Sequence, residues 1–72
     1  MTTFKRVKHG QYFILYGAFG KVAFILDDTK KERTPTRLHD GCYYSLPSDS
    51  IVEIVTPEAA KKQVLEYRRF EA

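Results

Sequence analysis

The sequence of 72 residues has no tryptophan, two histidines and a single cysteine, Cys42. One cysteine cannot form a disulfide within the chain, which fits a reducing compartment. No segment approaches the roughly 18 consecutive apolar residues that a membrane-spanning helix needs. The first residues show no apolar run after Lys5 and Arg6, so we expect no signal peptide. These absences together predict a cytoplasmic protein that has no membrane partner.

The shortage of cysteine and histidine also restricts the available chemistry. His39 and Cys42 have the spacing of half a zinc site, but zinc needs three or four protein ligands. Beyond these two, the sequence adds only the distant His9, with Asp40 or Asp49 as weaker candidates. A catalytic pair of these two side chains is disfavoured, because Asp40-Gly41 between them is expected to reverse the chain. The segment 17–20 has glycine at both ends but lacks the lysine and the following helix of a phosphate-binding loop. We therefore expect no enzymatic activity, no cofactor, no metal and no small-molecule substrate.

What the sequence does contain is enough apolar surface for one small folded domain, which we expect to span residues 1–72. Hydrophobic residues make up 43% and aromatic residues 14% of the chain, which argues against disorder. The net charge of +3 is uneven, because residues 1–39 carry eight Lys/Arg against three acids and residues 40–72 carry four against six. A basic N-terminal half permits an anionic partner, although a small excess charge also keeps a domain soluble.

Short apolar runs separated by turn residues predict a mainly β fold. β-Branched and aromatic residues dominate the first two runs, which are too short for helices and flank the glycine-bounded loop 17–20. Pro35 cannot donate to a ladder, so the third run should lie at a sheet edge. After the last run the period changes, and Thr56 suits a helix cap and Pro57 a first helical position. The expected strands are 11–16, 21–26, 34–38, 42–46 and 51–55, followed by a helix over about 57–70.

Five short strands in about fifty residues predict a small barrel, because closure removes the exposed edges of a sheet. Strand alternation divides the side chains into an inner and an outer set. The inner set expected to fill the barrel is Phe13, Leu15, Val22, Phe24, Leu26, Tyr44, Leu46, Val52 and Ile54. On the helix, Ala60, Val64 and Tyr67 fall on one face, which we expect to pack on the barrel.

The spacing of these core and turn positions resembles a pattern in small uncharacterised proteins of phages and bacteria. Its opening is Phe4-x-x-Val7-x-x-Gly10-x-x-Phe13, followed by the glycine hairpin, residues 21–26, Asp40-Gly41 and the strand that ends at Val55. The resemblance covers residues 4–55 and implies a five-stranded SH3-like barrel, to which this chain adds a C-terminal α-helix. It carries no catalytic residue.

Binding is the function that the residue types favour. Three tyrosines of the outer set could form a stacking surface with nearby cations, as in proteins that bind single-stranded nucleic acid. These residues are Tyr12, Tyr16 and Tyr43 with Lys5, Arg6, Lys8 and Lys21. A second basic patch comprises Lys30, Lys31, Arg33 and Arg37. The alternative is that the tyrosines pack under the C-terminal helix or the N-terminal arm, and that the charged loop is merely solvated.

The helix offers a different kind of contact. On a helical wheel Leu65 lies opposite the core face and is surrounded by Lys61, Lys62, Arg68 and Arg69. An apolar residue ringed by cations can anchor a protein partner, although a single exposed leucine is also ordinary. We therefore expect a binding module for nucleic acid or a nucleoprotein surface. The alternative is a phage or mobile-element factor that docks on a host protein complex.

Because the sequence has few metal ligands, we predict that the protein folds without a metal ion. The thermal unfolding midpoint of the purified protein should be the same with and without a chelator such as EDTA. A structural zinc ion contributes folding free energy, so a large drop in the midpoint on adding the chelator would contradict a metal-free fold.

Overall fold

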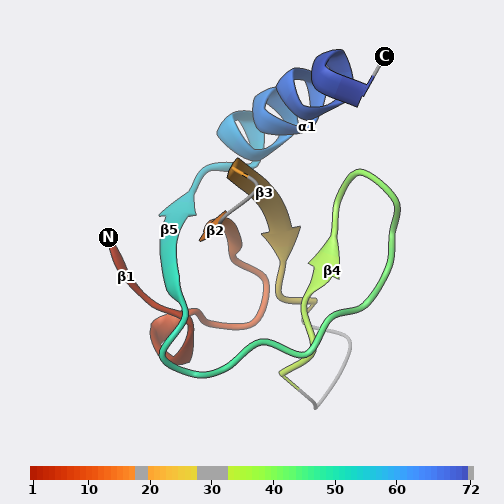
Figure 1. Cartoon of the computed structure of the whole chain (residues 1–72). Helices are drawn as coiled ribbons and strands as arrows, with labels where there is room; N and C mark the ends of the chain where they lie inside the picture. Colours follow the sequence, from red (N-terminus) through yellow and green to blue (C-terminus); the bar gives the residue numbers. More distant parts are fainter. Residues whose placement is uncertain (18–19, 28–32, 72) are drawn as a thin grey trace.

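The computed structural model contains one antiparallel sheet of five strands in the order β1-β5-β2-β3-β4, with a helix at the C-terminus (Figure 1). It describes residues 1–17, 20–27 and 33–71, with side chains as far as residue 66. The strands are β1 (Thr2–Thr3), β2 (Tyr12–Gly17), β3 (Gly20–Ile25), β4 (Thr36–Arg37) and β5 (Ile51–Val55). A single 3-10 turn, η1 (Phe4–Arg6), follows β1, and α1 (Pro57–Glu71) follows β5.

The β2–β3 hairpin forms where the first two apolar runs were predicted. Its register pairs Phe13 with Phe24 and closes at Gly17 and Gly20. Gly20 has a φ of 106°, a conformation that residues with a Cβ rarely adopt, which explains glycine at this end of the loop. Because opposite residues in an antiparallel pair share a face, this register sends Phe13 and Phe24 to one side of the sheet and Ile14 and Ala23 to the other.

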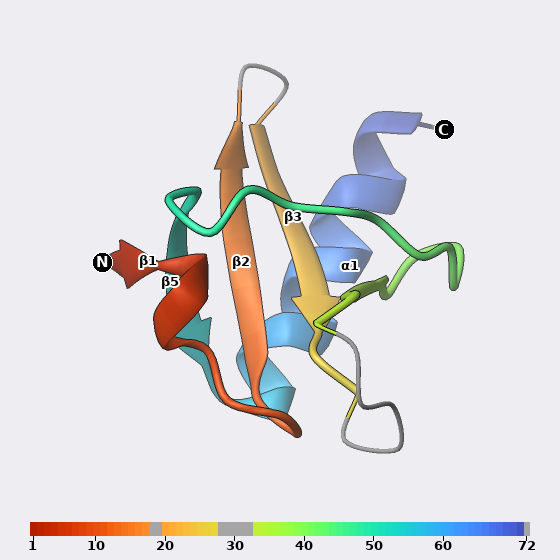
Figure 2. The ribbon, with the colours of Figure 1, turned by 90° about the horizontal axis from the view of Figure 1, so that it is seen from below.

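The fourth predicted strand is wrong, and the sheet does not close into a barrel. Within residues 33–71, segment 42–46 contributes only an isolated bridge between Thr36 and Tyr43, and the sheet ends at β1 and β4, which do not pair with each other. The backbone from residue 42 to residue 50 instead crosses the face of β3 and β2 to reach β5 (Figure 2). Its apolar side chains Tyr44 and Leu46 pack on the core, so the alternation of this segment reflects a cover over the sheet.

Two residues that showed no strand periodicity complete the sheet instead. Thr2 and Thr3 form β1 against Val52 and Ile51 of β5. Two residues are too few to produce an alternating pattern, so periodicity could not predict this strand. The prediction of a mainly β fold with a C-terminal helix is confirmed. Two predictions are corrected: which segments form the five strands, and the closure of the sheet into a barrel.

One core lies on the face that carries Phe13 and Phe24. Their rings are stacked with centroids 5.4 Å apart, and the Phe4 ring of η1 lies 5.5 Å from Phe13. The full cluster is Phe4, Val7, Phe13, Phe24, Leu26 and Val52, with Leu15, Val22, Tyr44 and Leu46 partly buried around it. The predicted inner set is therefore confirmed except for Ile54, which is 39% exposed. It shares the face of Phe13 by register, but β1 pairs only with residues 51 and 52 and does not extend beside it.

Helix α1 covers the opposite face of the sheet, above all β3 (Figure 2). The Thr56 hydroxyl accepts a hydrogen bond from the Ala59 amide at 3.2 Å, as expected of an N-cap. Ala60 is completely buried, and Ile14 and Ala23 of the sheet are buried on the same side. The helix face predicted from Ala60 and Val64 is thus the face that packs, while the side chain of Tyr67 lies outside the described residues.

Two adjacent alanines test the packing of α1. Ala60→Glu places a carboxylate in the sealed contact between helix and sheet and should lower the free energy of unfolding by about 3 kcal/mol or more. Ala59→Glu makes the same change at an exposed position and should stay within about 0.5 kcal/mol of the parent. Chemical denaturation measures both. Equal stability of the two variants would show that α1 is not part of the folded unit.

Candidate interaction surfaces

The residues predicted to form one stacking and phosphate surface lie on different sides of the sheet. Tyr16 is directly opposite Lys21 in the β2–β3 register, on the face that α1 covers. Lys5 and Arg6 belong to η1, whose Phe4 packs into the core on the other face. The structure therefore does not bring Tyr16 together with Lys5 and Arg6.

The first candidate surface is a group of exposed cations around η1, which we name the η1 cluster: Lys5, Arg6, Lys8 and Arg33. The 3-10 turn is fixed at its start, because the Phe4 amide donates to the Ser50 carbonyl at 2.9 Å and the Lys5 amide to the Ser48 carbonyl at 3.0 Å. Burial of the Phe4 ring orients the turn so that the two following side chains face solvent. Local backbone bonds and one aromatic anchor thus position these cations.

Arg33 joins this turn from a distant part of the sequence. Its guanidinium donates from Nη2 to the Phe4 carbonyl at 2.7 Å and lies 5.0 Å from the centre of the Phe4 ring. A hydrogen bond from a charged donor and a cation–π contact on the same residue restrict the rotamers of a long side chain. The result is a guanidinium held in place beside Lys5, although the two residues are far apart in the sequence.

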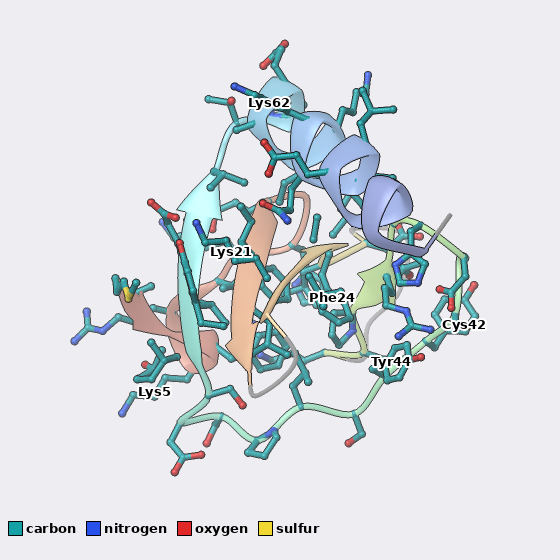
Figure 3. The ribbon with its side chains drawn as sticks, turned by 45° about the horizontal axis from the view of Figure 1, so that its top comes forward. Lys5, Lys21, Phe24, Cys42, Tyr44 and Lys62 are labelled. Atoms are coloured by element: carbon teal, nitrogen blue, oxygen red, sulfur yellow. The ribbon has the colours of Figure 1, made fainter. Side chains whose placement is uncertain are left out.

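The η1 cluster keeps an excess of positive charge. Among the described residues, no carboxylate pairs with the side chains of Lys5, Arg6 or Lys8. Among the described residues, two acids belong to segments that bond to this part of the chain: Asp49, between the two serines that bind η1, and Asp27, after the strand end that bonds to residues 10 and 11. Within this described part, the four cations outnumber these two carboxylates. Figure 3 shows Lys5 far from Lys62, which lies on α1.

Tyr16 and Lys21 form a separate group with Glu53 on the α1 side of the sheet. The Tyr16 hydroxyl donates to Glu53 Oε1 at 2.5 Å, and Lys21 Nζ lies 5.6 Å from the Tyr16 ring centre. The hydrogen bond to Glu53 raises the pKa of Tyr16, with smaller effects of desolvation and of the carboxylate charge. A carboxylate at the edge of this ring repels phosphate, so Tyr16 is a poor platform for a nucleic-acid base.

Arg37, the last residue of β4, makes contacts that hold together the turn after this strand. Its guanidinium forms an ion pair with Asp40 and lies 4.5 Å from the Tyr44 ring centre. The hydrogen bond from Arg37 holds the pKa of Asp40 well below its usual range. Asp40 Oδ1 also accepts from the Cys42 amide at 3.1 Å, and Gly41 takes a φ of 72° to complete the turn. Tyr43 is 57% exposed next to this turn, as predicted for an outer tyrosine.

The second candidate surface is a groove of about 360 Å³ beside α1, which we name the α1 groove. Among the described residues, its lining is Tyr12, Leu38, Lys61, Val64 and Leu65. Tyr12 is half-buried here, so the alternative of packing beside the helix holds for this tyrosine, and Leu65 remains 63% exposed at the rim. Sequence analysis selected Leu65 and Lys61 but missed Leu38, whose amide donates to the Ala23 carbonyl at 3.0 Å, a contact between segments that no local pattern contains.

Several predicted residues lie outside the described part of the chain. They are Lys30 and Lys31, between β3 and β4 in the sequence, and the side chains of Arg68 and Arg69 on α1. In the ranges 1–17, 20–27 and 33–66, no group of three or more His, Cys, Asp or Glu side chains could hold a metal ion. Across the described part of the chain, no helix has the length and apolar character to cross a membrane.

The Tyr16–Glu53 contact predicts a titration. Glu53→Gln should lower the pKa of Tyr16 towards the ordinary tyrosine value, measured by tyrosinate absorbance as the difference between each protein and its Tyr16→Phe counterpart. Because the folded pKa is raised, the stabilisation from this contact should be complete below about pH 10 and be lost as pH rises through the Tyr16 pKa. Glu58→Gln on α1 is the control. An unchanged Tyr16 titration in Glu53→Gln would contradict the contact.

Comparison with family models, with curated proteins and with solved structures found no match to this chain. The function is therefore inferred from the residues and geometry of the chain itself.

Proposed function

We propose that this protein is a non-enzymatic binding module that holds the phosphate backbone of nucleic acid on the η1 cluster. The observation that carries the proposal is the anchoring of Arg33 on Phe4 beside Lys5 and Arg6. A cation that is already fixed loses less side-chain entropy on binding than a mobile one. An exposed group of cations that contains a fixed guanidinium favours a polyanionic partner.

The donor chemistry fits phosphate. Arg33 uses Nη2 towards the Phe4 carbonyl, which leaves other guanidinium donors for a ligand. Arginine binds phosphate oxygens through its planar fork, and lysine ammonium groups act as point charges beside it. Lys5, Arg6 and Lys8 supply such charges at exposed positions. Release of counterions from the nucleic acid then supplies much of the binding free energy.

The same geometry favours contacts to the backbone over contacts to bases. The η1 segment is a single turn of three residues, too short to place a row of side chains in a groove of DNA. Tyr12 and Tyr16 lie on the other face of the sheet and cannot stack a base held at η1. The preference for single strands that these two tyrosines suggested therefore loses its support. We propose binding with little preference for sequence or strandedness.

An SH3-like arrangement remains part of the proposal. Two features support it: β5 returns to pair with β2, as a small barrel requires, and the Thr36–Tyr43 bridge stands where the fourth strand was expected. On this interpretation the chain has an SH3-like strand arrangement whose fourth strand is reduced to one bridge, so that the sheet does not close.

Salt dependence tests the binding proposal. Labelled mixed-sequence DNA, single- and double-stranded, should bind with an affinity that falls as salt rises. The double variant Lys5→Glu/Arg6→Glu should weaken binding at least about tenfold and reduce the log–log salt slope by about two, because each lost phosphate contact removes about one unit. Arg33→Lys retains the charge but loses the planar fork, and should give a smaller loss.

Lys62→Glu is the matched control, since it reverses an exposed lysine on α1, far from η1. It should leave the salt slope nearly unchanged. The proposal is wrong if DNA and RNA both fail to bind at about 50 mM salt, where counterion release is strong. The single variant Lys5→Glu changes the net charge by the same amount as Lys62→Glu. The proposal is equally wrong if these two variants weaken binding to the same extent, because net charge alone would then explain the effect.

A further inference from the structure

The α1 groove is a second surface with a different chemistry. Three of its lining side chains are aliphatic, and the ring of Tyr12 adds apolar area from the sheet. Its volume of about 360 Å³ lies near the lower end of the roughly 300–1,000 Å³ typical of ligand pockets. Leu65, 63% exposed, stands at the edge, so part of its apolar surface is available to a partner. A groove of this size suits one bulky apolar side chain.

Lys61 gives the groove a charge at its rim. Its side chain is exposed, and among the described residues no carboxylate forms an ion pair with it. Glu58 and Glu66 lie on the same helix but do not pair with it either. A partner that fills the groove can therefore add a carboxylate to this ammonium without displacing an existing ion pair. Charge complementarity of this kind raises the association rate and fixes the orientation of the partner.

We propose that the α1 groove docks an acidic segment of a partner protein, with one bulky apolar side chain between Leu38 and Leu65 and a neighbouring carboxylate on Lys61. Nucleic acid does not fit this site, because apolar walls cannot satisfy desolvated phosphate oxygens. A second copy of the chain fits less well than an acidic partner, because each copy carries a net charge of +3.

The inference goes beyond the proposed function and does not depend on it. The groove lies on the α1 face of the sheet, and the η1 cluster belongs to the opposite face. An occupant of one therefore leaves the other accessible. A module with both sites can hold an acidic protein segment and a nucleic acid at once, which is a physical route to a role within a nucleoprotein complex.

A short labelled peptide of sequence DELFDE provides the probe, measured by fluorescence anisotropy with the full chain. We expect a dissociation constant below about 1 mM, which corresponds to about −4 kcal/mol. The peptides NQLFNQ, without the acids, and DEAADE, without the apolar anchor, should each bind at least about fivefold more weakly, since each lacks one of the two contacts.

Neighbouring lysines give the sharpest comparison. Lys61→Glu should weaken DELFDE binding about tenfold. Lys62→Glu makes the same change at the adjacent residue, which is not among the lining residues, and should alter binding less than about twofold. Leu65→Asp should also abolish binding, and its exposed position should leave the thermal midpoint unchanged. Lys5→Glu should affect DNA binding alone.

The inference is overturned if DELFDE fails to bind up to about 1 mM, if NQLFNQ binds as well, or if the two lysine variants behave alike. Sedimentation of the parent protein tests whether a second copy of the chain occupies the groove. Self-association that Leu65→Asp removes would assign the groove to a second copy, and would also overturn the inference.

Discussion

The register of the β2–β3 hairpin is the constraint on which the rest of this small structure depends. Pairing Phe13 with Phe24 commits two aromatic rings to one face, and the alternation of the strands then commits Ile14 and Ala23 to the other. Both faces of the hairpin are apolar, so neither can be left to water without a loss of stability. A chain this short has few residues outside the hairpin, and these must cover both faces of the same two strands.

Each cover brings a different set of surface residues with it. On the Phe13 side, η1 and the segment 42–50 close the core, and the burial of Phe4 leaves Lys5 and Arg6 facing outward beside the anchored Arg33. On the Ile14 side, α1 packs through Ala60, and its flank meets the end of β4 at an incompletely filled groove. The cationic surface and the apolar groove are therefore consequences of how two faces are covered, and they lie on opposite sides of the sheet.

Periodicity predicted the elements that form part of a regular ladder or helix. The hairpin, β5 and α1 lie close to their expected bounds, and eight of the nine expected inner residues pack on the core. It failed for segment 42–46, because alternating apolar residues look the same whether a segment pairs as a strand or covers a sheet. It also failed for Thr2–Thr3, which gain their strand conformation only from β5. For the surfaces, residue types selected Lys5, Arg33 and Leu65, but which residues share a face depends on side-chain contacts between distant segments that no local pattern contains.

We infer that the two faces of the sheet carry separate binding surfaces. Amide chemical shifts of the labelled protein, recorded by NMR during a titration with duplex DNA, test it most directly. If the surfaces are separate, DNA should shift the amides of residues 4–8 and those around Arg33, and the amides that line the α1 groove should not move. Subsequent addition of DELFDE should then shift the groove amides while the DNA remains bound. Shifts from DNA that centre on Tyr12, Tyr16 or α1, or displacement of DNA by the peptide, would contradict two independent surfaces.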